Sequence, residues 1–364
     1  MKVLVIGAGG NFGSIISREL SQIPGIELVL AGRSEQAKLL AQELGVESWQ
    51  GDALGDGFEQ MLCDYGVDLV IHTAGPFQNQ PLTIAQACIN YGCHYCDLSD
   101  AREFVTKAKA LDCSAREKGV AILSGCSSVP TLSAAVIDSF LAKSGEGTVL
   151  KSIRHGITSS GKMPGLSTIV GVLEYAGRPI PQHQAGSRID AIGWKGLEAI
   201  KVNGISGWRL VANVDVPDMD IFPERYGVGD VVFKAGPGVA MGTLANYALA
   251  SAVQAGALKS TFRAAGWLHK MGQRFEFMGD GKSAMYVELK ALLRSEEAIY
   301  RWEILASHDK GPQIPCCGAI ALARKMAAGY TPAAGSRPCV GEISLEEYLY
   351  EIGPSFVTIT ESSS

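Results

Sequence analysis

Short apolar runs alternate with helix-like patterns along the first third of the chain. Val3–Ile6 is a continuous apolar run that ends at a glycine, and Ser14–Leu20 carries its apolar residues at helical spacing. Continuous apolar runs are typical of strands that are buried on both faces of a parallel sheet. The alternation predicts an α/β fold of the Rossmann type, a doubly wound parallel sheet with strands at residues 3–6, 26–31, 47–50, 68–72, 94–98 and 120–124.

The pattern changes after residue 130. Polar and apolar residues alternate over longer stretches, as between Tyr286 and Ala291, which indicates strands with one solvated face. We expect an inserted α+β domain with a mixed or antiparallel sheet, followed by a C-terminal segment that returns to the first domain. The predicted boundaries are 1–130, 131–312 and 313–355, and Thr360–Ser364 is expected to be a frayed end.

Composition narrows the class of protein. The chain has 364 residues, of which 47% are hydrophobic and 19% charged, so it can bury the cores of two globular domains. The net charge is −5 and Lys and Arg are scattered, so we expect no nucleic-acid partner. The longest apolar stretch, Leu244–Leu258, is interrupted by Asn246 and Gln254, so we expect no membrane-spanning segment.

The cysteines bear on compartment and metal binding. Nine cysteines, an odd number, with no signal-peptide pattern before the first strand, predict reduced thiols and a cytoplasmic location. Cys93 and Cys96 form a Cys-x-x-Cys, but no second pair accompanies them, and strand alternation places the two thiols on opposite faces. We therefore expect no metal site.

A glycine-rich turn lies between the first strand and the first helix. Glycines in this context let the backbone approach a dinucleotide pyrophosphate at the N-terminus of the helix. The alternative is a turn with a purely structural role. The candidate cofactor-binding residues of this turn are Gly7, Gly9, Gly10, Asn11, Phe12 and Gly13.

The end of the second strand indicates which dinucleotide binds. An acidic residue there would bind the ribose 2′-hydroxyl of NAD, whereas this chain has Arg33 and Ser34. A guanidinium and a hydroxyl suit a 2′-phosphate, so we predict NADP (NADPH) rather than NAD, the alternative being a solvated loop cation. Asp52, after the third strand, either contacts the edge of the adenine ring or only stabilises the turn in which it lies.

Motifs further along resemble a known family. His72–Phe77, with its Ala-Gly-Pro-Phe turn, and Tyr95–Asp97, a Tyr-x-Asp motif, resemble the saccharopine dehydrogenase/reductase-like family, and the similarity continues through Ser124–Pro130. The chain is most similar to a bacterial branch of that family. The resemblance implies a Rossmann domain, an inserted substrate and dimerisation domain, a homodimer, and C–N oxidoreduction that depends on a pyridine nucleotide. One departure is Ser99–Asp100, where the family usually has Gly-Glu.

The turn after the fourth strand lies at the carboxyl edge of the predicted sheet, where a nicotinamide ring would rest. We expect Ala74, Gly75, Pro76 and Phe77 to shape the floor of that pocket, the alternative being an ordinary tight loop. The resemblance also implies that the loop with Ser127 meets cofactor and substrate.

Asp97, Asp100 and Cys126 are the candidate catalytic residues, since all three follow strands at this edge. An anion there would stabilise a cationic iminium. Either aspartate is alternatively the N-cap of the helix expected at Ala101–Lys118, and Cys126 is alternatively an inert buried thiol.

Two features of the second domain bear on the substrate. Arg154 and His155 are candidates to hold a substrate carboxylate, Arg154 being alternatively a surface cation. Asp215–Tyr226 is rich in acids and prolines, which is typical of a turn-rich loop; metal or amine binding are the alternatives.

We therefore predict an NADP-dependent oxidoreductase that transfers hydride to or from an imine or secondary amine. The substrate would be a small amine, amino acid or keto acid. The alternatives are reduction of a C=C or C=O bond, and a non-catalytic sensor that binds NADP, because the fold does not name the substrate.

Overall fold

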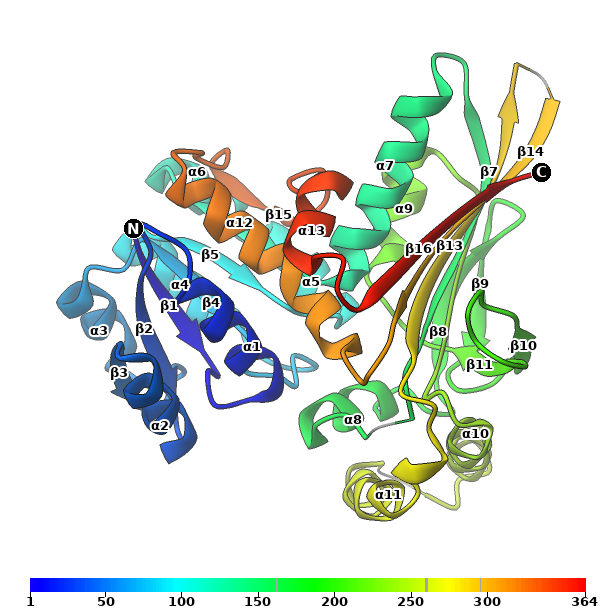
Figure 1. Ribbon diagram of the computed structural model, residues 1–364, viewed down its shortest axis with the longest axis horizontal. Helices are drawn as coiled ribbons and strands as arrows, with labels where there is room; N and C mark the ends of the chain where they lie inside the picture. The colour runs from blue at the N-terminus through cyan, green and yellow to red at the C-terminus, as the bar shows by residue number, and fades with distance from the viewer. Residues whose placement is uncertain (162, 259–260, 295) are drawn as a thin grey trace. The chain divides into compact units, whose positions relative to one another are not determined.

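Two compact units make up the structure, a computed structural model that describes residues 1–161, 163–258, 261–294 and 296–364 (Figure 1). The first unit comprises Met1–Ala135 and Pro312–Ile352, and the second comprises Val136–Gly311 and Gly353–Ser364. The chain therefore passes from one unit to the other three times. Among the residues so described, no helix is both long and apolar enough to cross a membrane.

A parallel sheet forms the centre of the first unit. Its strands follow the order β15-β6-β5-β4-β1-β2-β3, and each neighbouring pair is parallel, so the predicted Rossmann-type sheet is confirmed. Its strands are β1 (Lys2–Ile6), β2 (Glu27–Gly32), β3 (Glu47–Gln50), β4 (Leu69–His72), β5 (His94–Asp97), β6 (Ala121–Ser124) and β15 (Gly335–Pro338). Its helices are α1 (Asn11–Leu20), α2 (Glu35–Leu44), α3 (Phe58–Tyr65), α4 (Thr83–Tyr91), α5 (Arg102–Lys107), α6 (Asp112–Lys118), α12 (Cys317–Ala327) and α13 (Leu345–Ile352).

The apolar runs form central strands because both of their faces are covered. Val3, Leu4 and Val5 are fully buried in β1, and Ile71 is fully buried in β4. The strand order switches direction between β1 and β4, and ligands of such sheets bind at the carboxyl ends of the strands beside that switch. The sheet thus determines where the candidate residues meet.

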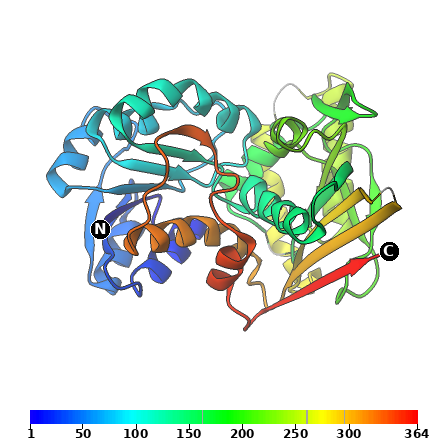
Figure 2. The same ribbon diagram turned by 90° about the horizontal axis from the view of Figure 1, so that it is seen from above.

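The C-terminal segment supplies a seventh strand that sequence analysis did not predict. β15 pairs with β6, and Figure 2 shows this segment, in orange, among the blue and cyan elements of the first unit. The Ser336 hydroxyl donates to the Ala108 carbonyl at 2.6 Å, and the Ser336 N–H donates to Asp112 Oδ1 at 2.9 Å. The helix expected at Ala101–Lys118 is accordingly broken: a 3₁₀ turn at Ala108–Leu111 separates α5 from α6 and presents that carbonyl to β15.

A mixed sheet forms the centre of the second unit, as predicted. Its main order is β10-β11-β12-β7-β13-β14-β16; β12 and β7 are parallel, and the other pairs on this path are antiparallel. Its strands are β7 (Val149–Thr158), β8 (Pro179–Gln184), β9 (Ser187–Ile192), β10 (Glu198–Ile200), β11 (Arg209–Asn213), β12 (Asp230–Gly236), β13 (Ser283–Leu293), β14 (Glu296–Ala306) and β16 (Val357–Ser363). Its helices are α7 (Ser133–Ser144), α8 (Leu166–Leu173), α9 (Asp218–Tyr226), α10 (Ala240–Gln254) and α11 (Phe262–Arg274).

Two expectations for the second unit are wrong. Thr360–Ser364 is not frayed, because β16 pairs with β14 over seven register positions. Asp218–Tyr226 is a helix rather than a turn-rich loop; Pro217 is its N-cap, and Asp218 and Asp220 lie in the first turn, where negative charge favours the helix dipole.

The C-terminal segment is anchored by a buried hydroxyl, which gives a test of its contribution. Tyr348 in α13 is fully buried and donates to the Ile314 carbonyl at 2.7 Å. We expect Tyr348→Phe to lower the free energy of unfolding by about 1–3 kcal/mol, because the carbonyl loses its partner without gaining water. Urea denaturation followed by circular dichroism measures this. The control is Tyr350→Phe in the same helix, where the side chain is 70% exposed; equal effects would contradict the assignment.

Candidate active site

The turns after β1 and β4 lie against each other. Thr73 fixes the contact, since its hydroxyl and its N–H both donate to the Ile6 carbonyl, at 2.8 and 2.9 Å. A Cβ on Gly7, where φ is +81°, would come within 2.8 Å of Thr73 Oγ1, and one on Gly13 within 2.2 Å of the Gly7 carbonyl oxygen. Both glycines are therefore required by close packing. Sequence analysis missed Thr73, although a Thr directly after a buried strand was a visible signal.

The N-terminus of α1 is suited to a pyrophosphate. Gly10 is the N-cap and makes no side-chain capping bond, and Asn11 is exposed. The first N–H groups of a helix have no partner within it, so they are available to an anion. Gly9 is exposed beside them, while Phe12 is half-buried. The residues of this turn thus fit the dinucleotide that the sequence predicts.

The predicted 2′-phosphate residues follow β2 directly. Arg33 and Ser34 are both exposed, and Ser34 is the N-cap of α2 without a side-chain capping bond, so its hydroxyl remains available. Asp52 is also exposed, but its Oδ1 accepts the Leu54 N–H at 3.1 Å. That bond is ordinary turn chemistry and favours the structural interpretation of Asp52.

The turn after β4 divides into exposed and buried residues. Ala74 and Gly75 are half-buried and Pro76 is exposed, so these three line the surface at the carboxyl edge. Phe77 is buried and packs edge-on against the His72 ring, with centroids 4.9 Å apart. Phe77 therefore packs in the interior and supports the turn, instead of lining the surface.

Asp97 joins the loops that follow β5 and β6. Its Oδ1 accepts the N–H groups of Ser99 and Gly125, each at 2.9 Å, and its carbonyl accepts the Cys126 N–H at 2.7 Å. The side chain is fully buried, and Oδ2 has no hydrogen-bond partner among the described residues. Burial raises the pKa of Asp97 to about 6, against the lowering effect of the bonds from Gly125 and Ser99.

A second buried pair lies next to Asp97. His72 ends β4 opposite Asp97 in the register, and its Nδ1 lies 3.0 Å from the Tyr95 hydroxyl. Burial lowers the pKa of His72 to about 4 and raises that of Tyr95 well above its usual value. Both groups are neutral near pH 7, as expected for core residues rather than for a base.

The other candidate catalytic residues differ in accessibility. Asp100 is half-buried at the carboxyl edge. The N-cap position of α5, which begins at Arg102, is occupied by Ala101 and by neither aspartate. Asp100 is thus the more exposed carboxylate of the pair.

Cys126 has the surroundings of an inert thiol. Cys339 donates to its Sγ at 3.4 Å, which lowers the pKa of Cys126, but contact with Cys96 and burial outweigh this and raise it well above the usual value. Ser127, the next residue, is 7% exposed. All nine cysteines are free thiols.

Arg154 and His155 do not act together. They are consecutive in β7, so their side chains lie on opposite faces of the sheet. His155 is fully buried, and its Nε2 lies 2.9 Å from Asp218 Oδ1 in α9, whereas Arg154 pairs with Glu198. Within the described ranges, no cluster of His, Cys, Asp and Glu is arranged to hold a metal ion.

Opposite titrations at Asp97 and His72 give a pH test. Asp97 binds its proton more tightly in the folded chain than in the unfolded chain, so its contribution to stability falls as pH rises from about 4 to 6. His72 binds its proton more tightly in the unfolded chain, so its contribution to stability rises over the same pH range. Asp97→Asn keeps an oxygen for both N–H groups and removes the first contribution. We expect its unfolding free energy to gain about 2 kcal/mol relative to the unaltered chain between pH 4 and 6.

Urea denaturation at pH 4, 5 and 6 measures this difference. The control is Asp56→Asn, which removes an exposed carboxyl from the same unit and should run parallel to the unaltered chain. If Asp97→Asn runs parallel as well, the raised pKa of Asp97 is wrong.

Comparison with known proteins agrees with this geometry. Residues 3–123 match the family model of the saccharopine dehydrogenase NADP binding domain. Saccharopine dehydrogenase (L-Glu forming) from Saccharomyces cerevisiae has a similar structure, with 12% identity, a TM-score of 0.68, and coverage of 100% of this chain and 99% of that one. The homospermidine synthase of Legionella pneumophila, solved in complex with NAD, has 12% identity, a TM-score of 0.67, and coverage of 100% and 91%. No curated sequence matches significantly.

The family match covers the glycine-rich turn, Arg33 and the ends of β4 and β5. It confirms the predictions of an NADP cofactor and of an NAD(P)-dependent oxidoreductase, while the two similar structures confirm the fold. Residues 3–123 thus match the NADP-binding domain of the saccharopine dehydrogenase family, and the fold of the whole chain is similar to that of saccharopine dehydrogenase.

Proposed function

We propose that this oxidoreductase transfers hydride to or from the C–N bond of a small amine or amino-acid substrate. The observation that carries the proposal is the pair Asp97 and Asp100 at the carboxyl edge of an NADP-binding sheet, one carboxylate buried and the other half-buried. The printed names of the two similar structures, a saccharopine dehydrogenase and a homospermidine synthase, support the same substrate class.

The charge at this edge favours an imine over a carbonyl as hydride acceptor. An iminium carries its proton and positive charge before hydride arrives, so its reduction to an amine needs a nearby anion and no further proton donor. Reduction of a carbonyl instead develops negative charge on oxygen, which a carboxylate would oppose. NADPH supplies the hydride when bound.

The residues take distinct roles in this proposal. Asp100 places its carboxylate beside the substrate nitrogen and stabilises its positive charge. Asp97 is a positioning residue, because it holds the Ser99 and Gly125 N–H groups and thereby the loops on either side of Asp100. The Gly7–Gly13 turn binds the pyrophosphate, and Arg33 with Ser34 binds the 2′-phosphate. The homodimer, the cytoplasmic location and a role for Ser127 stay predictions.

The 2′-phosphate role of Arg33 is tested by comparing two cofactors. We expect Arg33→Ala to weaken NADPH binding about tenfold or more and NADH binding far less, because only NADPH carries the phosphate. Fluorescence titration of the nicotinamide measures both dissociation constants. The control is Lys38→Ala, which removes an exposed cation from the adjoining helix α2. Equal losses for NADPH and NADH would contradict the assignment.

The reaction is tested with secondary amines. The unaltered chain, incubated with NADP⁺ and either saccharopine or homospermidine, should form NADPH, measured by absorbance. We expect Asp100→Asn to lower kcat at least about tenfold with NADPH affinity unchanged, since the substrate cation loses its counter-charge. Glu103→Gln, which neutralises an exposed carboxylate in α5, is the control. NADPH binding without turnover of any C–N substrate would favour the sensor alternative.

A further inference from the structure

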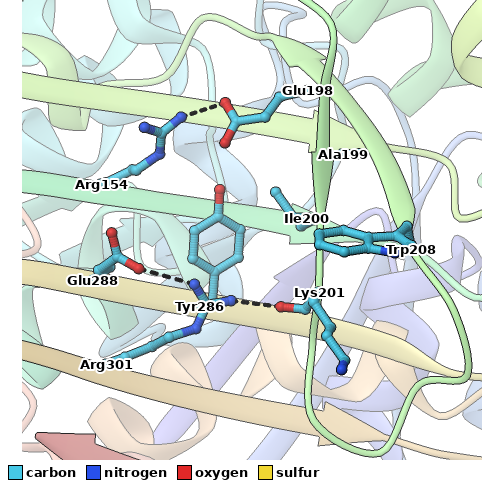
Figure 3. A pocket seen from close by; sticks show the side chains of 9 residues that line it. All are labelled: Arg154, Glu198, Ala199, Ile200, Lys201, Trp208, Tyr286, Glu288 and Arg301. Carbon is cyan, nitrogen blue, oxygen red and sulfur yellow. Dashed lines mark hydrogen bonds and ion pairs between the residues drawn. The ribbon is translucent and has the colours of Figure 1, made fainter. Parts of the chain in front are cut away.

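A charged pocket lies on the sheet of the second unit, on the face opposite His155. Its volume is about 310 Å³, and at roughly 30 Å³ per water it accommodates about ten non-hydrogen atoms. Figure 3 shows side chains from three neighbouring strands beneath it and the β10 segment beside it. The residues that line it are Arg154, Glu198, Ala199, Ile200, Lys201, Trp208, Tyr286, Glu288 and Arg301.

Strand register builds the floor of this pocket. Glu288 of β13 lies opposite Arg154 on one side and Arg301 on the other, so three charged residues form a row across β7, β13 and β14. Tyr286, two residues before Glu288, lies opposite Gly156. A Cβ on Gly156 would come within 2.8 Å of the Tyr286 ring, so a glycine there makes room for the aromatic side chain.

The Tyr286 hydroxyl has no partner within the part of the chain that the structure describes. The side chain is 1% exposed, and Figure 3 shows its hydroxyl pointing toward Arg154 and Glu198 in the pocket. Burial raises the pKa of Tyr286 to about 12, so the group is a hydrogen-bond donor at neutral pH. A buried polar group without a partner is costly in a native protein, which points to a ligand as its partner.

The charges of the lining are both positive and negative. Arg154 pairs with Glu198, and Arg301 donates to Glu288 at 3.0 Å. Lys201 is exposed at the rim beside the β10 segment, so the lining holds three cations and two carboxylates. Trp208, also at the rim, is 68% exposed, an uncommon exposure for so large an apolar side chain.

We propose that this pocket binds a small amino dicarboxylate, a ligand with two carboxylates and one ammonium. One ligand carboxylate accepts from Tyr286 Oη and Arg154, and the other lies at Arg301 and Lys201. The ammonium lies at Glu288. The two ligand carboxylates thus meet the three cations of the lining, and the ammonium meets Glu288.

Simpler ligands leave part of the lining without a counterpart. A plain dicarboxylate places its negative charge near Glu288 and offers that carboxylate no cation. A diamine leaves the Tyr286 hydroxyl without an acceptor and faces the two guanidinium groups. The pocket also lies wholly within the second unit, so this inference does not rest on the proposed reaction.

Isothermal titration calorimetry without nucleotide tests the proposal. The probes are L-aspartate, succinate, which lacks the ammonium, and L-asparagine, which lacks the second carboxylate. We expect one L-aspartate to bind per chain, with the other two probes at least tenfold weaker. Tyr286→Phe should weaken L-aspartate binding about tenfold, because it removes only the hydroxyl. Tyr300→Phe, on the opposite face of β14 where the ring stacks on Phe140, is the control.

A second variant tests whether the ligand ammonium binds at Glu288. A third variant tests whether L-aspartate binds at this pocket rather than at the candidate active site. Glu288→Gln should weaken L-aspartate binding and leave succinate binding unchanged. Asp100→Asn should leave L-aspartate binding unchanged, whatever it does to turnover. The proposal is overturned if L-aspartate does not bind, if Tyr286→Phe binds it as tightly as Tyr300→Phe does, or if Asp100→Asn abolishes binding.

Discussion

The exclusion of water around the Asp97 carboxylate determines the arrangement of the candidate active site. Backbone N–H groups at the ends of two strands need an acceptor in a place that water does not reach, and Asp97 Oδ1 accepts two of them. The same burial that makes these bonds valuable raises the pKa of the carboxyl, so the residue that holds the loops is also easily protonated. His72, across the register, shifts in the opposite direction for the same reason.

Sequence patterns predicted the elements whose contacts are local, and failed where a partner is far along the chain. The parallel sheet, the glycine-rich turn and Arg33 follow from short runs of residues. The break at Ala108 does not, because the hydrogen-bond donor to the Ala108 carbonyl is the Ser336 hydroxyl, 228 residues later. The helix at Asp218 was not predicted because its acidic residues and prolines are typical both of turns and of helix N-termini. The accessibilities of Asp97 and Asp100, three residues apart, depend on tertiary packing alone.

The two faces of the second sheet place neighbouring residues in different surroundings. Arg154 and His155 are neighbours in sequence, yet one lines an open charged pocket and the other is fully buried against α9. Strand periodicity predicted that alternate residues would differ, and the expectation of one polar face holds for Glu288 and Arg301. It could not predict that the segment around β10 would cover part of that face and bury Tyr286. A solvated face and a lined pocket have the same sequence pattern.

The return of the chain to the first unit has a consequence for biosynthesis. The edge of β6 that pairs with β15 has no partner strand until β15 has been translated. The Ala108 carbonyl likewise has no Ser336 hydroxyl to bond with until 228 further residues have been added to the chain. At roughly 5–20 residues per second, that interval is about 10–50 s. During this time an apolar strand edge is exposed on the nascent chain, and such edges recruit other strands. The first unit is thus the first to begin synthesis and cannot complete its sheet until most of the second has emerged from the ribosome.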